Sequence, residues 1–351
     1  MSLFRPNIKA MTGYSPGEQL TGEVLKLNAN ENPYPPSPRV LAALRDAIDG
    51  NFHRYPDPVA TCLREEAGKL YGVSPNMVLC GNGSDDLLTI IVRSFVGEGE
   101  KIVSPQPSYI LYRTLADIQG AEFEAVEFPP DYSLPPGLAD ADGKVTFVAN
   151  PNSPSGTMIP VHDLEELAES LNGILVVDEA YVDFADENAM RLARKFDNVV
   201  VLRTLSKSYS LAGMRVGLAV AHESLIEGML KVKDSYNINV LSIIAGTAAL
   251  SDQEYLQEIV GKIRKTRQYI ADELRDMDIE VFPSQSNFVM ARFGEDRVRK
   301  VYEALKAQRI LIRYYDVPGV RDCLRITVGT QEQTERVVGE LRTFLNSANA
   351  S

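Results

Sequence analysis

The amino-acid sequence predicts an α/β protein: a large domain with a mostly parallel sheet flanked by helices, a smaller α+β domain and an N-terminal arm. Short apolar runs alternate with amphipathic stretches from residue 40 to residue 221, which is the pattern of βα units in a parallel sheet. Beyond about residue 224 longer helices take over. A chain of 351 residues can bury one large core and a second, smaller one.

The N-terminal segment is predicted to be an arm. Residues 32–38 are rich in proline and form helices poorly, and the Ser37-Pro38 pair is a typical helix start. We therefore expect an arm at residues 1–36 that joins the small domain, a large domain at residues 37–240 and a small domain at residues 241–351.

Five apolar runs indicate buried strands of the large domain. They are residues 77–80, 101–103, 145–148, 174–177 and 199–202. Polar or glycine-rich residues follow most of them. Ligands of open α/β sheets bind beyond the carboxyl ends of the strands, so these residues are where we expect chemistry.

The C-terminal third predicts a compact α+β unit. Apolar residues between 256 and 274 keep largely to one face of a helix, which would link the two domains. Strands are expected near residues 287–293, 310–314 and 323–328, and helices at residues 295–307 and 331–345.

Composition excludes several classes of protein. The formal net charge of -12 argues against a nucleic-acid-binding surface, which needs concentrated lysine and arginine. The three cysteines and three histidines are scattered without metal-ligand spacing, so we expect no metal site and a reducing, intracellular setting. The sequence has no apolar run of membrane-spanning length and no signal-peptide pattern, and we expect a cytoplasmic protein that binds neither membrane nor nucleic acid.

Residues 204–217 contain the most informative motif. They place Lys207 between hydroxyl side chains just after an apolar strand, with Arg215 eight residues further on. An amine that bonds an aldehyde must lose its proton near neutral pH, and nearby positive charge and partial desolvation favour this. Pyridoxal 5′-phosphate supplies an aldehyde, a phosphate and an electron sink together. Taken alone, the motif also fits a surface lysine in a serine-rich loop.

Asp178 ends another apolar strand, where an unpaired buried carboxylate is costly. A protonated pyridine nitrogen is a suitable partner, because the aspartate would keep the ring charged and strengthen its withdrawal of electrons. Tyr181, from the same segment, could hydrogen-bond the phenolic oxygen of the ring. The alternative is an aspartate that caps a strand and a tyrosine in the core.

Three further segments follow predicted strands. Residues 81–86 open an amphipathic helix, whose positive N-terminus suits a phosphate, although a structural turn with a helix cap is an equal alternative. Tyr109 could stack on a flat ring or pack in the core. Residues 150–156 form a constrained turn with amide donors. Arg325 lies within an apolar strand, where its fork suits a carboxylate or a phosphate, the alternative being a structural ion pair.

Taken together, these motifs resemble those of the fold-type I pyridoxal-phosphate-dependent aminotransferases of class II, in particular the branch that acts on histidinol phosphate. The matching segments are residues 27–33, 54–56, 81–86, 107–109, 152–156, 178–181, 206–207, 215 and 323–329. The resemblance covers nearly the whole chain, and the order and spacing of the segments make it specific.

The resemblance implies roles for single residues. Lys207 would bond the cofactor, Asp178 would pair with the pyridine nitrogen, and Tyr181 would contact the phenolic oxygen. Tyr109 would stack on the ring. The phosphate would be held by Gly83, Ser84, Asp85, Thr204, Ser206 and Arg215, with Tyr55 reaching across from a second subunit, which implies an obligate homodimer with shared active sites. The anionic group of the substrate would be received by Arg325, with Arg313, Asn30 and Tyr14 near it.

One motif departs from the family pattern. The usual Asn-Asn-Pro-Thr-Gly reads Asn152-Ser153-Pro154-Ser155-Gly156 here, so serine stands where the family has the asparagine beside the cofactor oxygen. We assign this contact to Asn152, with Ser153 as the weaker donor.

The implied reaction is transamination of L-histidinol phosphate with 2-oxoglutarate, giving imidazole-acetol phosphate and L-glutamate in histidine biosynthesis. Aromatic amino-acid transamination and threonine-phosphate decarboxylation are alternatives with the same cofactor. A regulator that binds the cofactor without turnover would need an attached DNA-binding unit, and the sequence shows no helix-turn-helix pattern or basic segment for one.

Overall fold

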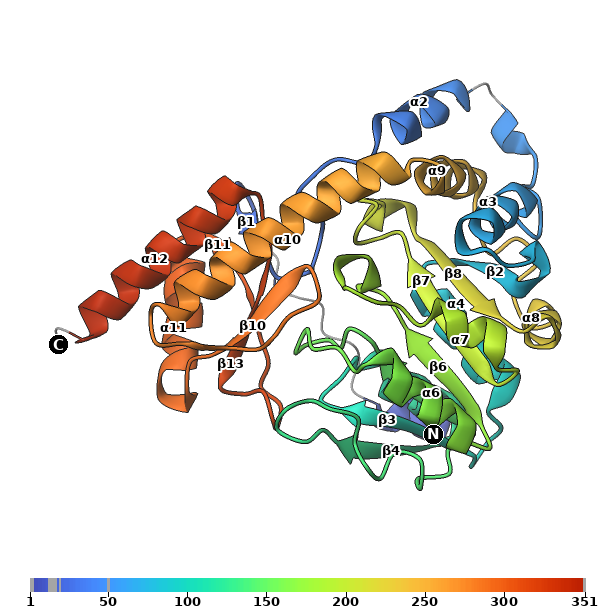
Figure 1. The fold of residues 1–351 in the computed structure, drawn as a ribbon, viewed down its shortest axis with the longest axis horizontal. Helices are drawn as coiled ribbons and strands as arrows, with labels where there is room; N and C mark the ends of the chain where they lie inside the picture. The colour runs from blue at the N-terminus through green and yellow to red at the C-terminus, as the bar shows by residue number, and fades with distance from the viewer. Residues whose placement is uncertain (1–2, 12–17, 19, 49–50, 350–351) are drawn as a thin grey trace.

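The computed structural model describes residues 3–11, 18, 20–48 and 51–349. Figure 1 shows a large domain around a twisted sheet and a smaller domain beside it, with the long helix α10 (Gln253–Arg275) running from one to the other. None of the helices within the described ranges has the length and apolar character needed to cross a membrane.

The large domain contains a seven-stranded sheet. Its strands are β2 (Val78–Asn82), β3 (Lys101–Gln106), β4 (Glu122–Glu127), β5 (Val145–Ala149), β6 (Ile174–Asp178), β7 (Val199–Thr204) and β8 (Val216–Ala221). Their order is β2-β8-β7-β6-β5-β3-β4, and β8 runs antiparallel to both of its neighbours. The five predicted strands and the mostly parallel sheet are confirmed. β4 and β8 were not predicted from the sequence.

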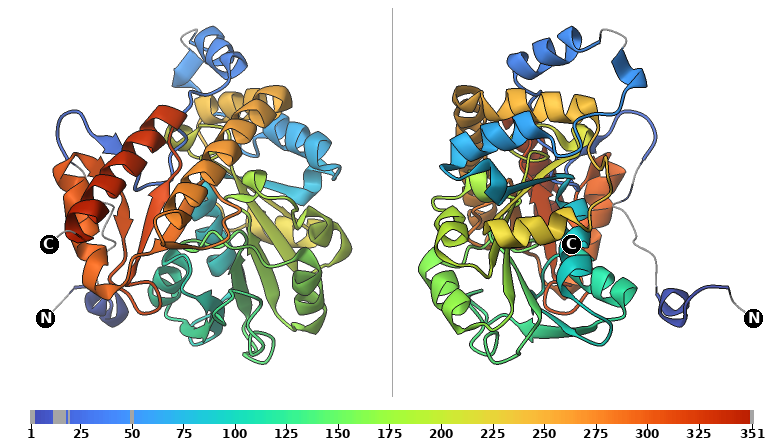
Figure 2. Two further views of the ribbon diagram at one scale, coloured as in Figure 1. Left: turned by 60° about the vertical axis from the view of Figure 1, so that its left-hand side comes forward. Right: turned by 90° about the vertical axis from the view of Figure 1, so that its right-hand side faces the viewer.

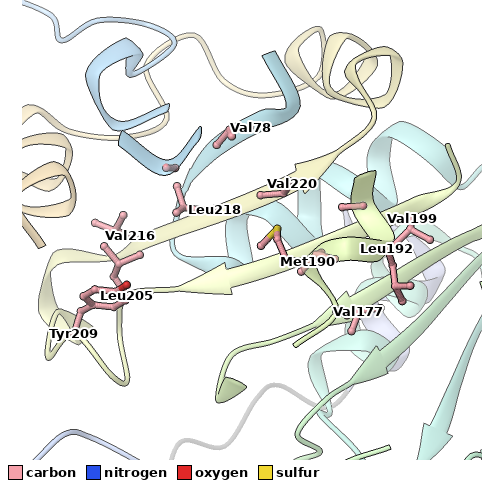
Figure 3. Packing of buried hydrophobic residues seen from close by; sticks show 14 of the residues in the cluster. Val78, Val177, Met190, Leu192, Val199, Leu205, Tyr209, Val216, Leu218 and Val220 are labelled. Atoms are coloured by element: carbon pink, nitrogen blue, oxygen red, sulfur yellow. The ribbon is translucent and has the colours of Figure 1, made fainter. Parts of the chain in front are cut away.

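Alternate residues of the strands serve two cores, one on each face of the sheet. On β7, Val199 and Val201 belong to one cluster of buried side chains, whereas Val200 and Leu202 belong to the other. The first core contains residues of α3 (Thr61–Tyr71), α6 (Val161–Ser170), α7 (Met190–Lys195) and α9 (Val240–Leu250), and part of it is seen in Figure 3. The second contains residues of α4 (Ser84–Phe95), α5 (Leu111–Gln119) and α8 (Glu223–Leu230). Such two-sided burial explains why these strands are apolar throughout.

The small domain has an antiparallel sheet of order β12-β13-β10-β9. Its strands are β9 (Glu280–Val281), β10 (Phe288–Arg292), β12 (Arg313–Tyr314) and β13 (Cys323–Thr327). Helix α11 (Glu295–Ala307) has the predicted bounds, and α12 (Gln331–Asn349) extends four residues beyond its predicted end. Both helices and the second half of α10 cover a core of their own.

The expectation of a single strand at residues 310–314 is wrong. Two short strands are present, because β11 (Ile310–Leu311) pairs in parallel with β1 (Leu25–Lys26), whereas β12 pairs with β13. The buried Ile312 lies between the two strands. The arm therefore contributes a strand beside the small domain.

The helices before and after β1 in the sequence lie at the periphery of the molecule. Helix α1 (Pro6–Ala10) lies beside α5, where Asn7 donates a hydrogen bond to the carbonyl of Asp117 at 2.8 Å (Figure 2). Helix α2 (Pro38–Asp46) starts as predicted, because the Ser37 hydroxyl accepts the Arg39 amide hydrogen.

Helix α10 contributes side chains to one core of the large domain and to the core of the small domain. Ile259 and Ile263 pack in the core of the large domain, and Ile270 and Leu274 pack in that of the small domain. The change from one core to the other therefore lies within this helix, further along the chain than residue 241, where the small domain is expected to begin. The division into domains stays a prediction.

Candidate active site

The polar residues that follow the strands of the large sheet face the small domain and the arm. Asp178 ends β6 and Thr204 ends β7, and Tyr181 and Lys207 follow these two strands by three residues each. From the other side, Asn30 of the arm reaches Tyr181 and Arg325 of β13 reaches Ser153. Predicted site residues of the large domain, the small domain and the arm therefore meet at one place.

Asp178 is buried, with 4% of its surface exposed. One carboxylate oxygen accepts the Tyr112 hydroxyl hydrogen at 2.8 Å, and the other accepts the Ala180 amide hydrogen at 3.2 Å. No lysine, arginine or histidine within the described ranges forms an ion pair with it. Burial raises the pKa of this carboxyl to about 6, although the hydrogen bond from Tyr112 opposes the rise. A cation placed beside Asp178 would remove this desolvation cost.

Lys207 lies beside Tyr181 and the arm. Its Nζ donates to the carbonyl of Ala29 at 3.3 Å and lies 5.8 Å from the centre of the Tyr181 ring. Asn32 donates to the backbone carbonyl of Lys207 at 2.8 Å, so the arm also holds the loop that carries the lysine. Asn30 donates to the Tyr181 hydroxyl at 2.9 Å, which leaves the Tyr181 hydrogen free for another acceptor.

Arg215 and the start of α4 form a cradle for an anion. The Arg215 guanidinium makes only long contacts, 3.3 Å to Asp85 and 3.4 Å to the Ser206 hydroxyl, and the Thr204 hydroxyl donates to Ser206. Gly83 precedes the helix with φ 83°, and a Cβ there would come within 2.5 Å of Arg215. Ser84 begins the helix, whose free amide groups and positive end favour an anion. The cationic fork, the hydroxyls and the glycine fit a phosphate.

Tyr109 lies close to the same cradle. Its hydroxyl donates to Asp85 at 3.1 Å, and its ring meets Tyr112 edge-on with 5.6 Å between the ring centres. Burial and the nearby Asp85 carboxylate raise the pKa of Tyr109. Its ring therefore lies beside Asp85 of the cradle and beside Tyr112, the partner of Asp178, while its stacking on a cofactor ring stays a prediction.

Arg325 is held between the two domains. It is 8% exposed and donates to the Ser153 hydroxyl at 3.2 Å and to the carbonyl of Asn28 at 3.0 Å, while its guanidinium lies 5.0 Å from the centre of the Phe288 ring. The Phe288 ring also meets Tyr181 edge-on at 5.1 Å. Arg325 has no carboxylate partner among the described residues. A buried guanidinium that binds only neutral groups is suited to an anionic ligand.

The remaining predicted residues are placed less directly. Arg313 lies opposite Arg325 in the β12–β13 pair, with its guanidinium 5.3 Å from the Tyr315 ring centre. Tyr55 is 79% exposed and stacks on Tyr236 at 4.3 Å, without an interaction with the residues above. Tyr14 falls outside the described residues.

The side chain of Asn152 is directed into its own loop. Both amide hydrogens are donated, to the carbonyl of Pro107 at 3.1 Å and to the Ser155 hydroxyl at 2.8 Å, and the amide oxygen accepts from Ser108. In this arrangement Asn152 has no hydrogen left to donate to a ligand. Its predicted contact with a cofactor stays a prediction, and the Ser153 hydroxyl beside Arg325 is the neighbouring donor.

Several residues that support the site were not predicted from the sequence. Tyr112 bonds Asp178, while Thr327 and Asn287 hold the backbone of Asn30 by hydrogen bonds of 3.0 and 3.1 Å. Tyr112 lies 66 positions from its partner in the sequence, and no local pattern links the two residues. No group of three or more histidine, cysteine, aspartate or glutamate side chains suited to a metal occurs in the described part of the chain.

Comparison with known proteins decides the family. Residues 22–341 match the family described as "Aminotransferase class I and II". The chain belongs to this family. Among curated aminotransferases, it is 47% identical over 346 residues to histidinol-phosphate aminotransferase 1 of Trichormus variabilis, covering 97% of this chain and 99% of that one. It is also 47% identical over 352 residues to the histidinol-phosphate aminotransferase of Rhodopirellula baltica, covering 99% and 97%.

Solved aminotransferase structures have the same fold. The histidinol-phosphate aminotransferase of Sinorhizobium meliloti, in complex with pyridoxal-5′-phosphate, superposes with a TM-score of 0.92 at 28% identity over 99% of both chains. An aspartate aminotransferase of Thermus thermophilus superposes with a TM-score of 0.82 at 19% identity over 97% of this chain and 99% of that one. The predicted fold-type I aminotransferase architecture is confirmed.

Proposed function

We propose that this aminotransferase uses pyridoxal 5′-phosphate to transfer the amino group of L-histidinol phosphate to 2-oxoglutarate, giving imidazole-acetol phosphate and L-glutamate in histidine biosynthesis. The names of the relatives at 47% identity over almost the full length support the substrate. The Sinorhizobium meliloti structure, which is a complex with pyridoxal-5′-phosphate, supports the choice of cofactor. The geometry that carries the proposal is the buried Asp178, which lacks a cationic partner in the described chain and lies in the same site as Lys207 and Arg215.

The residues of the site fit the cofactor at three points. The buried carboxylate of Asp178 suits a protonated pyridine nitrogen, since the new ion pair would offset the desolvation that raises its pKa. Arg215, with Ser206, Thr204 and the amide groups that begin α4, suits the phosphate. The free hydrogen of the Tyr181 hydroxyl suits the phenolic oxygen. When bound, the cofactor withdraws electrons from the α-carbon of the amino donor.

Lys207 would act both as the residue that bonds the aldehyde and as the proton carrier. Its Nζ would take the proton from the α-carbon of the donor and would return a proton to the carbon of the former aldehyde group, on the other side of the donor's nitrogen. Asn32 and Ala29 hold this side chain and its loop close to Tyr181, so the amine stays near the reacting atoms. Tyr109 would keep the cofactor ring in place by stacking on it.

Arg325 would receive the anionic group of both substrates. A guanidinium can bind the phosphate of histidinol phosphate in one half-reaction and a carboxylate of 2-oxoglutarate in the other, because both present two oxygens to its fork. Ser153 and the carbonyl of Asn28 orient it, and Phe288 packs between it and Tyr181. We assign Arg313, Asn30 and Tyr14 to the surroundings of the substrate.

We also propose a homodimer in which Tyr55 completes the site of the other subunit. Tyr55 and Tyr236 form an exposed aromatic pair, and Ile48 and Phe52 are exposed on the same stretch of chain. Large exposed apolar side chains that cluster are typical of an interface.

We propose a cytoplasmic location. The three cysteines are unpaired, which agrees with it.

The test is a comparison of amino donors with 2-oxoglutarate as the common acceptor. Histidinol phosphate, phenylalanine and tyrosine are assayed in turn, and kcat/KM for histidinol phosphate should exceed the others by at least roughly a hundredfold. The phosphate carries more charge than the carboxylate of these amino acids and lies further from the α-carbon, so a donor site that fits the phosphate holds the amino acids less well. Equal or higher kcat/KM for phenylalanine would make this an aromatic aminotransferase. Release of carbon dioxide from threonine phosphate without a keto acid would make it a decarboxylase.

A further inference from the structure

A cluster of four polar side chains lies next to the residues of the proposed cofactor site. Arg203 forms ion pairs with Glu179 at 3.0 Å and with Asp183 at 2.8 Å, and the Ser208 hydroxyl donates to the second oxygen of Asp183. Arg203, Glu179 and Ser208 are buried, and the Asp183 side chain is 23% exposed. The Arg203 guanidinium also lies 5.3 Å from the centre of the Tyr71 ring. None of the four belongs to the predicted site.

Each member of this cluster is a near neighbour in the sequence of a residue with a proposed role. Glu179 follows Asp178, Arg203 precedes Thr204 and Ser208 follows Lys207. Asp183 lies two residues after Tyr181, at the centre of the short helix η3 (Val182–Phe184). The cluster therefore connects β6, β7 and the loop of Lys207 through ion pairs and a hydrogen bond. These three segments carry the pyridine partner, a phosphate ligand and the reactive amine.

Resting on the proposed function, we propose that Arg203 and Asp183 are positioning residues that hold Lys207 for reaction through the Ser208 hydroxyl. The ion pair with Arg203 holds the Asp183 carboxylate, and this carboxylate in turn holds Ser208, the residue after the lysine. Asn32 holds the same loop from the arm side at the carbonyls of Lys207 and Ser208. The loop is thus fixed from two sides, which limits the positions of the amine at its end.

The test separates capture of the cofactor aldehyde from binding of the cofactor. Capture joins the Lys207 nitrogen to the aldehyde carbon with loss of one water, and its rate is followed with pyridoxal 5′-phosphate by borohydride reduction and mass analysis. Binding is measured with pyridoxamine 5′-phosphate, which has no aldehyde. The variants are Ser208→Ala, Asp183→Asn and both together. Ser210→Ala is the matched control, because the structure gives this buried hydroxyl of the same loop no hydrogen-bond partner.

We expect each single variant to capture the aldehyde roughly tenfold more slowly, the order of effect of a lost hydrogen bond to a charged group. The double variant should be no slower than the worse single variant, because both changes remove one interaction. Pyridoxamine phosphate affinity should stay close to that of the unaltered protein in every variant, and the thermal midpoint should stay close to it in Ser208→Ala. In Asp183→Asn the midpoint should fall, because the buried Arg203 loses one of its two carboxylate partners. Ser208→Thr should capture the aldehyde at the rate of the unaltered protein, since it keeps the hydroxyl.

Unchanged capture in both single variants, or equal losses of capture and of pyridoxamine phosphate affinity, would overturn the positioning role. Additive losses in the double variant would also contradict it. The unaltered protein distinguishes this failure from failure of the proposed function: if it captures no pyridoxal phosphate, the function is wrong, whereas normal capture in protein and variants alike refutes the inference alone.

Discussion

Asp178 shows how a single residue exchanges stability for binding. Its pKa rises from 3.8 in the unfolded chain to about 6 in the folded one, mainly because it is buried. Between these two values the folded protein keeps a proton that the unfolded chain has lost, so stability falls as pH rises from about 4 to about 6. Above about pH 6 the full cost remains until a cation binds beside the carboxylate.

Asp178→Asn should therefore stabilise the cofactor-free protein while weakening cofactor binding. We expect the free energy of unfolding to rise by about 1 to 3 kcal/mol at pH 8, with the gain vanishing below about pH 4. Pyridoxal phosphate should bind roughly thirtyfold more weakly or worse, because a buried charge pair is lost. Thermal melts across pH and cofactor titration check both. A variant that melts lower than the parent at pH 8 would contradict this view of Asp178.

Tyr112 acts on the same carboxylate. Tyr112→Phe keeps the ring, which stacks on Phe147 with 4.7 Å between the centres, and removes only the hydrogen bond to Asp178. That hydrogen bond lowers the pKa of Asp178, so its loss raises the pKa further. In the cofactor-free protein, the range over which stability falls with rising pH should therefore extend upward by about one pH unit, which thermal melts across pH measure. Tyr132→Phe, in a separate cluster with Phe282, is the control and should leave this range unchanged.

Among the elements, β8 approaches the start of α4 so closely that it requires a glycine. A Cβ on Gly217 would come within 2.5 to 2.6 Å of the backbone of Gly83 and Ser84, which begin the phosphate cradle. Gly217→Ala should destabilise the protein by about 1 to 3 kcal/mol and weaken phosphate binding, because the turn must move. Melting temperature and cofactor affinity measure this. The nearby Gly213→Ala, where a Cβ meets nothing within 4 Å, should change neither.

The sequence predicted the elements better than their pairing. Continuous apolar runs indicated β5, β6 and β7, because burial on both faces leaves a local signal. The break within residues 310–314 has no such signal, since it arises when Leu311 pairs with Lys26 of the arm and Arg313 with Arg325. The site motifs could be predicted because each is a short local pattern. The contacts of Tyr112 and Arg203 could not, because they join segments that are distant in the sequence.

At the scale of the whole molecule, the proposed dimer predicts complementation between two inactive subunits. Lys207→Ala and Tyr55→Ala protomers carrying different tags are co-expressed and the mixed dimer is purified. If Tyr55 acts across the interface, one of the two sites contains both native residues, and the mixed dimer should have about half the activity of the unaltered dimer. Activity no higher than that of the Tyr55→Ala dimer would place Tyr55 in its own subunit's site.

The covalent role of Lys207 is the claim on which the whole account depends. The most direct measurement is borohydride reduction of the protein with pyridoxal 5′-phosphate bound, followed by peptide mapping. The account predicts one modified peptide, with the label on Lys207, and no label in the Lys207→Ala variant. A label on another lysine, or no label on the unaltered protein, would contradict it.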